Sequence, residues 1–132
     1  MKNNLIWIAV LAVAVIFFIY KFFLSGSSEF NIEPEKFSEL AKEKDVVVLD
    51  VRSAFEYGGD KIAGAQNISY SAADFKERIG KLDKEKTYLV YCATGSRSAG
   101  ACSYLKSAGF THIYNLKGGI EHWKSTGMPV IR

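Results

Sequence analysis

The chain of 132 residues contains only two cysteines and two histidines. Cys92 and Cys102 are ten residues apart and have no second cluster of ligands nearby, so they do not form the paired motif of a structural zinc site. Two free thiols fit a reducing compartment, although a disulfide would need only a Cα separation below about 7 Å. We expect surface or structural roles for His112 and His122, and neither a metal nor an organic cofactor.

The sequence also lacks any concentration of charge of one sign. Its formal net charge of +3 is spread along the chain, with no arginine-rich cluster and no basic stripe interleaved with aromatics. Those are the marks of nucleic-acid-binding proteins, so we expect no binding to nucleic acid. There are no internal repeats and no low-complexity tract. The length suits one folded domain and little else.

A long apolar run stands at the amino terminus. Leu5 to Tyr20 is unbroken, and residues 22–24 extend it to twenty residues with Lys21 as the one interruption. At a rise of about 1.5 Å per residue, a helix of this length spans the roughly 30 Å of a bilayer core. Trp7 and Tyr20 lie near its two ends, as interfacial aromatics do, and Lys21 can extend its ammonium to the interface.

We interpret residues 1–24 as an uncleaved transmembrane anchor, residues 25–29 as a linker and residues 30–132 as the soluble domain. A core helix of one small domain is seldom apolar on every face. A cleaved signal peptide is the stronger alternative, since small residues follow the run, although its apolar region is normally shorter. We place the protein in the inner (plasma) membrane with a single pass. Lysines at positions 21, 36 and 42 favour a cytoplasmic domain over an extracytoplasmic one, although a soluble domain can cross regardless of charge.

Strand and helix patterns alternate through the soluble part. The predicted strands are residues 46–49, 65–68, 88–91 and 113–116, and the predicted helices begin near residues 34, 53, 71, 96 and 118. The apolar, β-branched strand Val46–Leu49 is typical of a strand buried on both faces, as in a parallel sheet covered by helices. This alternation predicts an α/β fold with a mainly parallel sheet.

The loop from Tyr91 to Ser98 carries most of the functional information. Cys92 follows a predicted strand and precedes a predicted helix, so it lies at the edge of the sheet where ligands bind in such folds. Backbone N–H groups and the helix dipole favour an anion there, and the same field favours thiolate over thiol. Gly95 lets the loop curl with its N–H groups inward. The sequence therefore predicts an activated cysteine beside a small anion site.

Residues 30–131 resemble a single-domain rhodanese, a member of the sulfurtransferase family. The resemblance is carried, in chain order, by residues 48–52, Glu56-Tyr57, residues 62–65, Ile68, residues 92–98, residues 116–119, Trp123 and residues 127–130. It implies a rhodanese-like fold with a mainly parallel central sheet flanked by helices on both faces, preceded here by one transmembrane helix. One segment departs from the family, because Asp60-Lys61-Ile62 stands where many members carry Gly-His-Ile, and Ser69 stands where proline is common.

The resemblance also implies the chemistry. Cys92 takes a sulfane sulfur from thiosulfate or a persulfide donor, becomes a persulfide, and gives the sulfur to cyanide, a thiol or a protein acceptor. The residues that would bind the sulfur anion are Ala93, Thr94, Gly95, Ser96, Arg97, Ser98 and Arg52. Arg97 can hold an oxyanion or support the loop, and Ser96 and Ser98 can cap the helix or donate to the anion. We expect Asp50 to be structural, Arg52 to be structural or pocket-facing, and Glu56 to be a surface or structural partner.

Three other functions compete with sulfur transfer. Cysteine phosphatases of related fold place five residues between cysteine and arginine and a histidine before the cysteine; here four residues separate Cys92 from Arg97 and Tyr91 precedes the cysteine. Both differences speak against a phosphatase. A membrane-tethered binding or persulfide-carrier module with little free turnover is the main alternative. The last is a redox protein with a Cys92–Cys102 disulfide, against which stands the expectation that Cys102 is a small buried hydrophobe.

Overall fold

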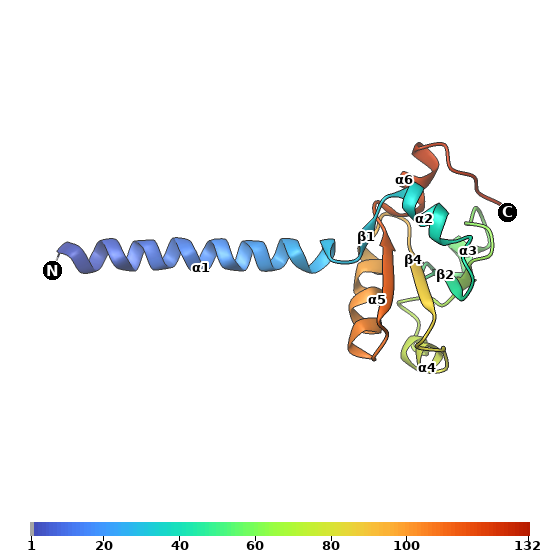
Figure 1. Cartoon of the computed structure of the whole chain (residues 1–132), viewed down its shortest axis with the longest axis horizontal. Coiled ribbons are helices and arrows are strands. Elements are labelled where there is room, and N and C mark those ends of the chain that lie inside the picture. The colour runs from blue at the N-terminus through green and yellow to red at the C-terminus, as the bar shows by residue number, and fades with distance from the viewer. Residues whose placement is uncertain (1) are drawn as a thin grey trace.

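The computed structural model describes residues 2–132, and the side chains considered are those of residues 3–21 and 29–132. One long helix precedes a domain in which strands and helices alternate (Figure 1). This helix, α1, spans Lys2–Ser28. It therefore continues through most of the predicted linker at residues 25–29, because serine and glycine weaken a helix without necessarily ending it.

The described side chains of the first helix, at residues 3–21, are mostly apolar and are not covered by the domain. Its segment Asn3–Lys21 has a mean hydropathy of 2.2, and none of it is buried. It is long and apolar enough to cross a membrane, and a signal sequence near the amino terminus meets the same criterion. We expected from the sequence that this segment is not a helix of the domain core, and its exposure agrees with that expectation.

The domain is built on one parallel sheet. In the described part of the chain the strand order is β1-β5-β4-β2-β3, and every pairing between these strands is parallel. The strands are β1 (Asn31–Ile32), β2 (Val46–Asp50), β3 (Gln66–Asn67), β4 (Thr87–Tyr91) and β5 (His112–Leu116). The parallel sheet confirms the predicted fold class. Strand β1 was not predicted, because two residues are too short to show alternation.

Helices cover both faces of the sheet. On one face, α4 (Phe75–Gly80) and α5 (Ser96–Ser107) pack Phe75, Ile79 and Leu105 against the strands. On the other, α2 (Pro34–Leu40) and α6 (Gly119–Ser125) contribute Phe37 and Trp123 to a second cluster. The short α3 (Ala54–Tyr57) follows the carboxyl end of β2. The two-faced covering is the arrangement that the uninterrupted apolar strands predicted.

One predicted boundary was wrong. The helix expected to begin at Ser71 begins at Phe75, and residues 70–74 form turns and a bend. In this segment the Ala72 N–H donates to the Ser69 carbonyl and the Phe75 N–H to the Ala72 carbonyl, at 3.2 and 3.1 Å. These bonds span three residues and not the four of an α-helix, so the chain turns sharply before Phe75 enters the core.

Candidate active site

Cys92 lies where strand β4 leaves the sheet and helix α5 begins. Strand β4 ends at Tyr91, and α5 starts four residues after the cysteine, at Ser96. Gly95 precedes the helix with φ 106°, in the left-handed region that favours glycine. This conformation curls the loop around the cysteine, as predicted from the glycine at this position.

Hydrogen-bond donors converge on the Cys92 sulfur. The Gly95 N–H lies 3.1 Å from Sγ and the Ser98 hydroxyl 3.3 Å, and the cysteine is 1% exposed. Burial by itself would raise the pKa of this thiol. Donors from the Ser98 hydroxyl and from the N–H groups of Ser98, Gly95 and Thr94 outweigh burial, so the pKa lies below the ordinary value of a cysteine. The site therefore favours the thiolate, the reactive form of the side chain.

Helix α6 holds the loop from the other side of the sheet. The Ile120 N–H donates to the Cys92 carbonyl at 2.9 Å, and the Glu121 N–H donates to the Ala93 carbonyl at 3.1 Å. Gly119, with φ 65°, makes this approach possible, because a Cβ there would lie 2.4 Å from the Ala93 oxygen. The sequence marked the Gly118-Gly119 pair but did not predict this contact with the loop.

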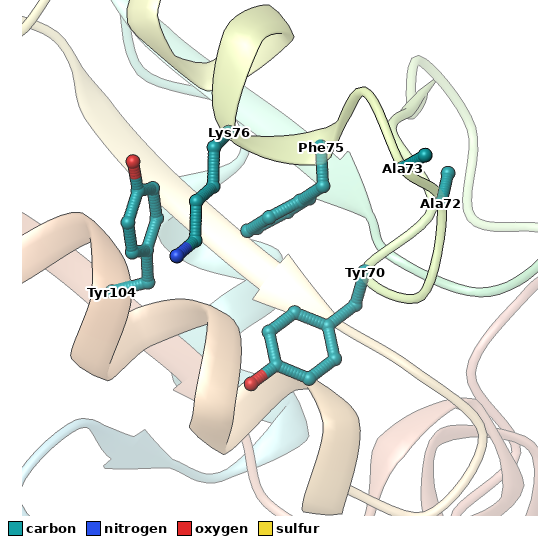
Figure 2. A pocket seen from close by; sticks show the side chains of 6 residues that line it. All are labelled: Tyr70, Ala72, Ala73, Phe75, Lys76 and Tyr104. Carbon is teal, nitrogen blue, oxygen red and sulfur yellow. The ribbon is translucent and has the colours of Figure 1, made fainter.

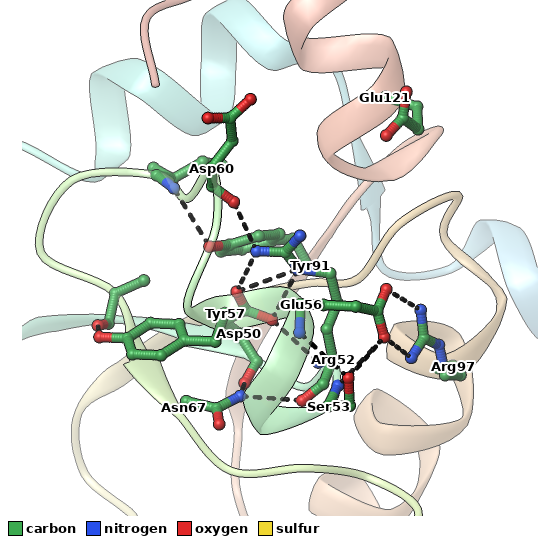
Figure 3. A network of polar contacts seen from close by, with 12 residues as sticks. Asp50, Arg52, Ser53, Glu56, Tyr57, Asp60, Asn67, Tyr91, Arg97 and Glu121 are labelled. Atoms are coloured by element: carbon green, nitrogen blue, oxygen red, sulfur yellow. Dashed lines mark hydrogen bonds and ion pairs between the residues drawn. The ribbon is translucent and has the colours of Figure 1, made fainter. Parts of the chain in front are cut away.

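Arg97 is fixed by an ion pair with α3. Its guanidinium donates to both carboxylate oxygens of Glu56, Nη1 to Oε1 at 2.8 Å and Nη2 to Oε2 at 3.0 Å (Figure 3). Glu56 also closes a capping box with Ser53 at the start of α3. The hydrogen bond from Arg97 is the main reason that the pKa of Glu56 falls to about 2. The ion pair thus holds the Arg97 side chain beside the loop. The side chain is about one-third exposed, so its remaining N–H groups are free to donate to a bound anion.

In the described part of the chain, the Arg52 side chain makes no hydrogen bond or ion pair with residues 92–98. Its Nη2 donates to Asp50 Oδ2 and to the Asp60 carbonyl, both at 2.8 Å, and its guanidinium lies over the Tyr91 ring at 5.6 Å (Figure 3). Asp50 is fully buried, and Arg52 is 6% exposed. A buried carboxylate needs a charged and hydrogen-bonded partner, and Arg52 provides it. The departure at Asp60-Lys61 fits this arrangement, because only the Asp60 backbone is used by Arg52.

The rest of the loop divides into buried and exposed positions. Ser98 is buried, and its hydroxyl also lies 3.1 Å from the Gly95 carbonyl. Thr94 and Ser96 are exposed, and Ala93 is partly buried. Gly95 takes the position before the helix, and no side chain caps α5. The capping role considered for Ser96 and Ser98 was therefore wrong, because the αL glycine leaves the cap position without a side chain.

The second cysteine and the histidines lie outside the site. Cys102 is fully buried as a free thiol, and burial strongly raises its pKa, with the nearby Cys92 adding to this shift. Such a thiol resists ionisation and suits the structural role that we expected. His122 lies 3.6 Å from Glu33, and His112 is exposed at the start of β5. Trp123 fills the core, as predicted.

The domain also has a surface groove, and none of the loop residues lines it. Its volume is about 480 Å³, and Tyr70, Phe75, Lys76 and Tyr104 surround it (Figure 2). The Lys76 ammonium lies 5.4 Å from the centre of the Tyr104 ring. The donors to the Cys92 sulfur, the Gly95 N–H and the Ser98 hydroxyl, therefore lie outside this groove.

Comparisons with known proteins agree with this geometry. Residues 33–126 match the family described as Rhodanese-like domain. A thiosulfate sulfurtransferase GlpE of Coxiella burnetii is 41% identical over 87 residues, covering 66% of this chain and 79% of the relative. The GlpE thiosulfate sulfurtransferase of Pseudomonas putida is 38% identical over 101 residues, covering 75% and 89%. A crystal structure of a rhodanese-related protein from Thermoplasma volcanium superimposes with a TM-score of 0.68 at 37% identity, covering 76% of this chain and 96% of the other.

Proposed function

Because the chain belongs to the family of rhodanese-like domains, we propose that it is a sulfurtransferase that carries sulfane sulfur on Cys92. The donor is thiosulfate or a persulfide, and the acceptor is thiophilic: cyanide, a thiol or a protein. The observation that carries this proposal is the convergence of the Gly95 N–H and the Ser98 hydroxyl on the Cys92 sulfur. The similarity to relatives named thiosulfate sulfurtransferase supports the same reaction.

The reaction proceeds in two displacements at sulfur. The Cys92 thiolate attacks the outer sulfur of thiosulfate, a new S–S bond forms, and the old S–S bond breaks as sulfite leaves with the electron pair. The acceptor then attacks the outer sulfur of the persulfide, and Cys92 leaves as the thiolate. Sulfur is anionic before, between and after these steps, so donors aimed at Sγ and its neighbourhood favour each of them.

The loop residues have different parts in this proposal. We assign the binding of the sulfur anion to Ala93, Thr94, Gly95, Ser96, Arg97 and Ser98. The N–H groups of Thr94, Gly95 and Ser98 are directed at the sulfur, and the Arg97 guanidinium attracts the oxyanion of thiosulfate. Glu56 neutralises part of that charge, so Arg97 attracts the oxyanion less strongly than an unpaired arginine would. We assign Arg52 a supporting part, since its contacts are with Asp50, Asp60 and Tyr91.

Loading of sulfur tests the proposal directly. The full-length protein in detergent should gain the mass of one sulfur atom after incubation with thiosulfate, and cyanide or a thiol should remove that mass. Intact-mass spectrometry measures both steps, and peptide mapping should place the sulfur on Cys92. A protein that gains no sulfur from thiosulfate or from a low-molecular-weight persulfide is not a sulfurtransferase of this kind. A protein that loads but does not discharge to small acceptors is the carrier module instead.

We further propose that α1 anchors the domain in the inner (plasma) membrane with a single pass, the domain lying on the cytoplasmic side. The apolar, fully exposed segment Asn3–Lys21 supports this proposal. The full chain should stay in the membrane after alkaline carbonate washing and should keep its original amino terminus. A protease added to sealed cells should leave the domain intact. A mature protein that begins beyond residue 24 would instead identify a cleaved signal peptide.

A further inference from the structure

Asn115 is a buried polar residue directly behind the active loop. It lies on β5 and is 2% exposed, between neighbours that are mostly apolar. Its Nδ2 donates to the Asn31 Oδ1 at 2.8 Å and to the Gly95 carbonyl at 3.4 Å. Its Oδ1 has no hydrogen-bond partner within the described side chains. Burying an amide whose oxygen has no hydrogen-bond partner lowers the stability of the fold. The presence of an asparagine at this buried position therefore calls for a functional explanation.

The orientation of this amide is fixed by its surroundings. The Gly95 carbonyl can only accept a hydrogen bond, so the Asn115 group that faces it must be Nδ2. Turning the amide over would place Oδ1 against the Gly95 oxygen. Asn31, in the first strand after α1, adds a second acceptor on the same side. The donor of Asn115 therefore remains directed at the loop.

Three donors compete for the Gly95 carbonyl. They are the Ala99 N–H at 3.1 Å, the Ser98 hydroxyl at 3.1 Å and the Asn115 amide at 3.4 Å. A carbonyl oxygen has two lone pairs, and the Ala99 N–H takes one as the first hydrogen bond of α5. Ser98 has one hydroxyl hydrogen and two acceptors within reach, the Gly95 oxygen and the Cys92 sulfur at 3.3 Å.

We propose that Asn115 is a positioning residue for the Cys92 sulfur. By occupying the second lone pair of the Gly95 carbonyl, it leaves the Ser98 hydroxyl hydrogen to the sulfur. Asn31 holds Asn115 in that orientation, so the first strand of the domain contributes to the site through this hydrogen bond. The inference rests on the proposed function only for the reason that a reactive thiolate is needed. The claim itself is about how the Cys92 thiolate is stabilised before any sulfur is bound.

Other charged and titratable groups lie on the elements that flank the active loop. From α5 these are Arg97, which is paired with Glu56, and Cys102, which burial keeps as a thiol. The end of β2 brings the Asp50–Arg52 pair, and α6 brings Glu121. None of these groups contacts the Asn115 side chain among the hydrogen bonds and ion pairs of the described residues. Changing Asn115 therefore removes none of these charged groups.

The test is the pH dependence of Cys92 alkylation by iodoacetamide, in full-length protein carrying Cys102→Ala. In Asn115→Leu the midpoint should move to higher pH, and the thiolate fraction below the midpoint should fall about three- to tenfold, the effect of one neutral hydrogen bond. Asn31→Ala should move the midpoint in the same direction but by a smaller amount. This milder variant tests the inference if Asn115→Leu does not fold. As a matched control, Asn67→Ala removes an amide that binds the Asp50 and Arg52 carbonyls, and it should leave the midpoint unchanged.

A double-mutant cycle decides whether the effect passes through Ser98. In a Ser98→Ala background, Asn115→Leu should produce no further shift of the midpoint. An unchanged midpoint in both Asn115→Leu and Asn31→Ala, or an equal shift in the Ser98→Ala background, would overturn the inference. Alkylation requires no sulfur transfer, so failure here leaves the proposed function standing. Failure to load sulfur would likewise leave this result intact.

Discussion

Cys92→Ser should reduce sulfur transfer from thiosulfate to cyanide by more than about a thousandfold, to the rate without protein. A serine hydroxyl does not ionise near neutral pH, and it is a poor nucleophile toward sulfur. The donors that surround Sγ would stabilise neither a thiolate nor a persulfide in this variant. Formation of thiocyanate, followed by its colour with iron(III), measures the rate.

The second cysteine provides the control for this result. Cys102→Ala removes a fully buried thiol whose raised pKa keeps it protonated, so transfer should stay within about threefold of the unchanged protein. Transfer that survives in Cys92→Ser, or that disappears in Cys102→Ala while the protein stays folded, would contradict the assignment of Cys92 as the sole sulfur carrier. Loss in both variants would instead favour the two-cysteine redox function.

The sequence was sufficient for the local features of the site. It predicted a helix that begins near residue 96, and α5 begins at Ser96. It also identified the parallel sheet from strands that are apolar along their whole length. These features depend on neighbouring residues and on the burial of each strand, both of which can be read along the chain.

The support of the loop could not be predicted in the same way. Glu56 and Arg97 are separated by 41 positions, and Asn115 reaches Gly95 across 20. The contact of α6 with the Cys92 and Ala93 carbonyls depends on how a helix on the opposite face of the sheet begins against the loop. A sequence pattern gives the type of each residue but not which distant partner satisfies it, so these contacts appear only with the tertiary structure.

Arg52 is the residue for which sequence and structure lead to different experiments. If it bound thiosulfate, Arg52→Met would raise KM and leave stability unchanged. The structure leads us to expect the opposite, because methionine would leave the fully buried Asp50 carboxylate without its ion-pair partner. Breaking a buried pair in this way lowers the free energy of unfolding by about 3–5 kcal/mol. That is a large part of the roughly 5–15 kcal/mol that stabilises a typical domain.

Urea denaturation measures this loss, and thiosulfate titration of the folded fraction at low temperature measures KM. Arg132→Met is the matched control, since Arg132 is highly exposed and pairs with Asp60 at the surface, where solvent screens the charges. Its unfolding midpoint should stay close to that of the unchanged protein. Arg52→Lys should fall between the two, because a lysine keeps the charge but cannot reproduce the forked contact with Asp50. If KM rises more than tenfold in Arg52→Met while the unfolding midpoint stays unchanged, Arg52 binds substrate and our assignment is wrong. If the unfolding midpoint falls while KM stays near normal, the Asp50–Arg52 pair supports the strand end on which the loop depends.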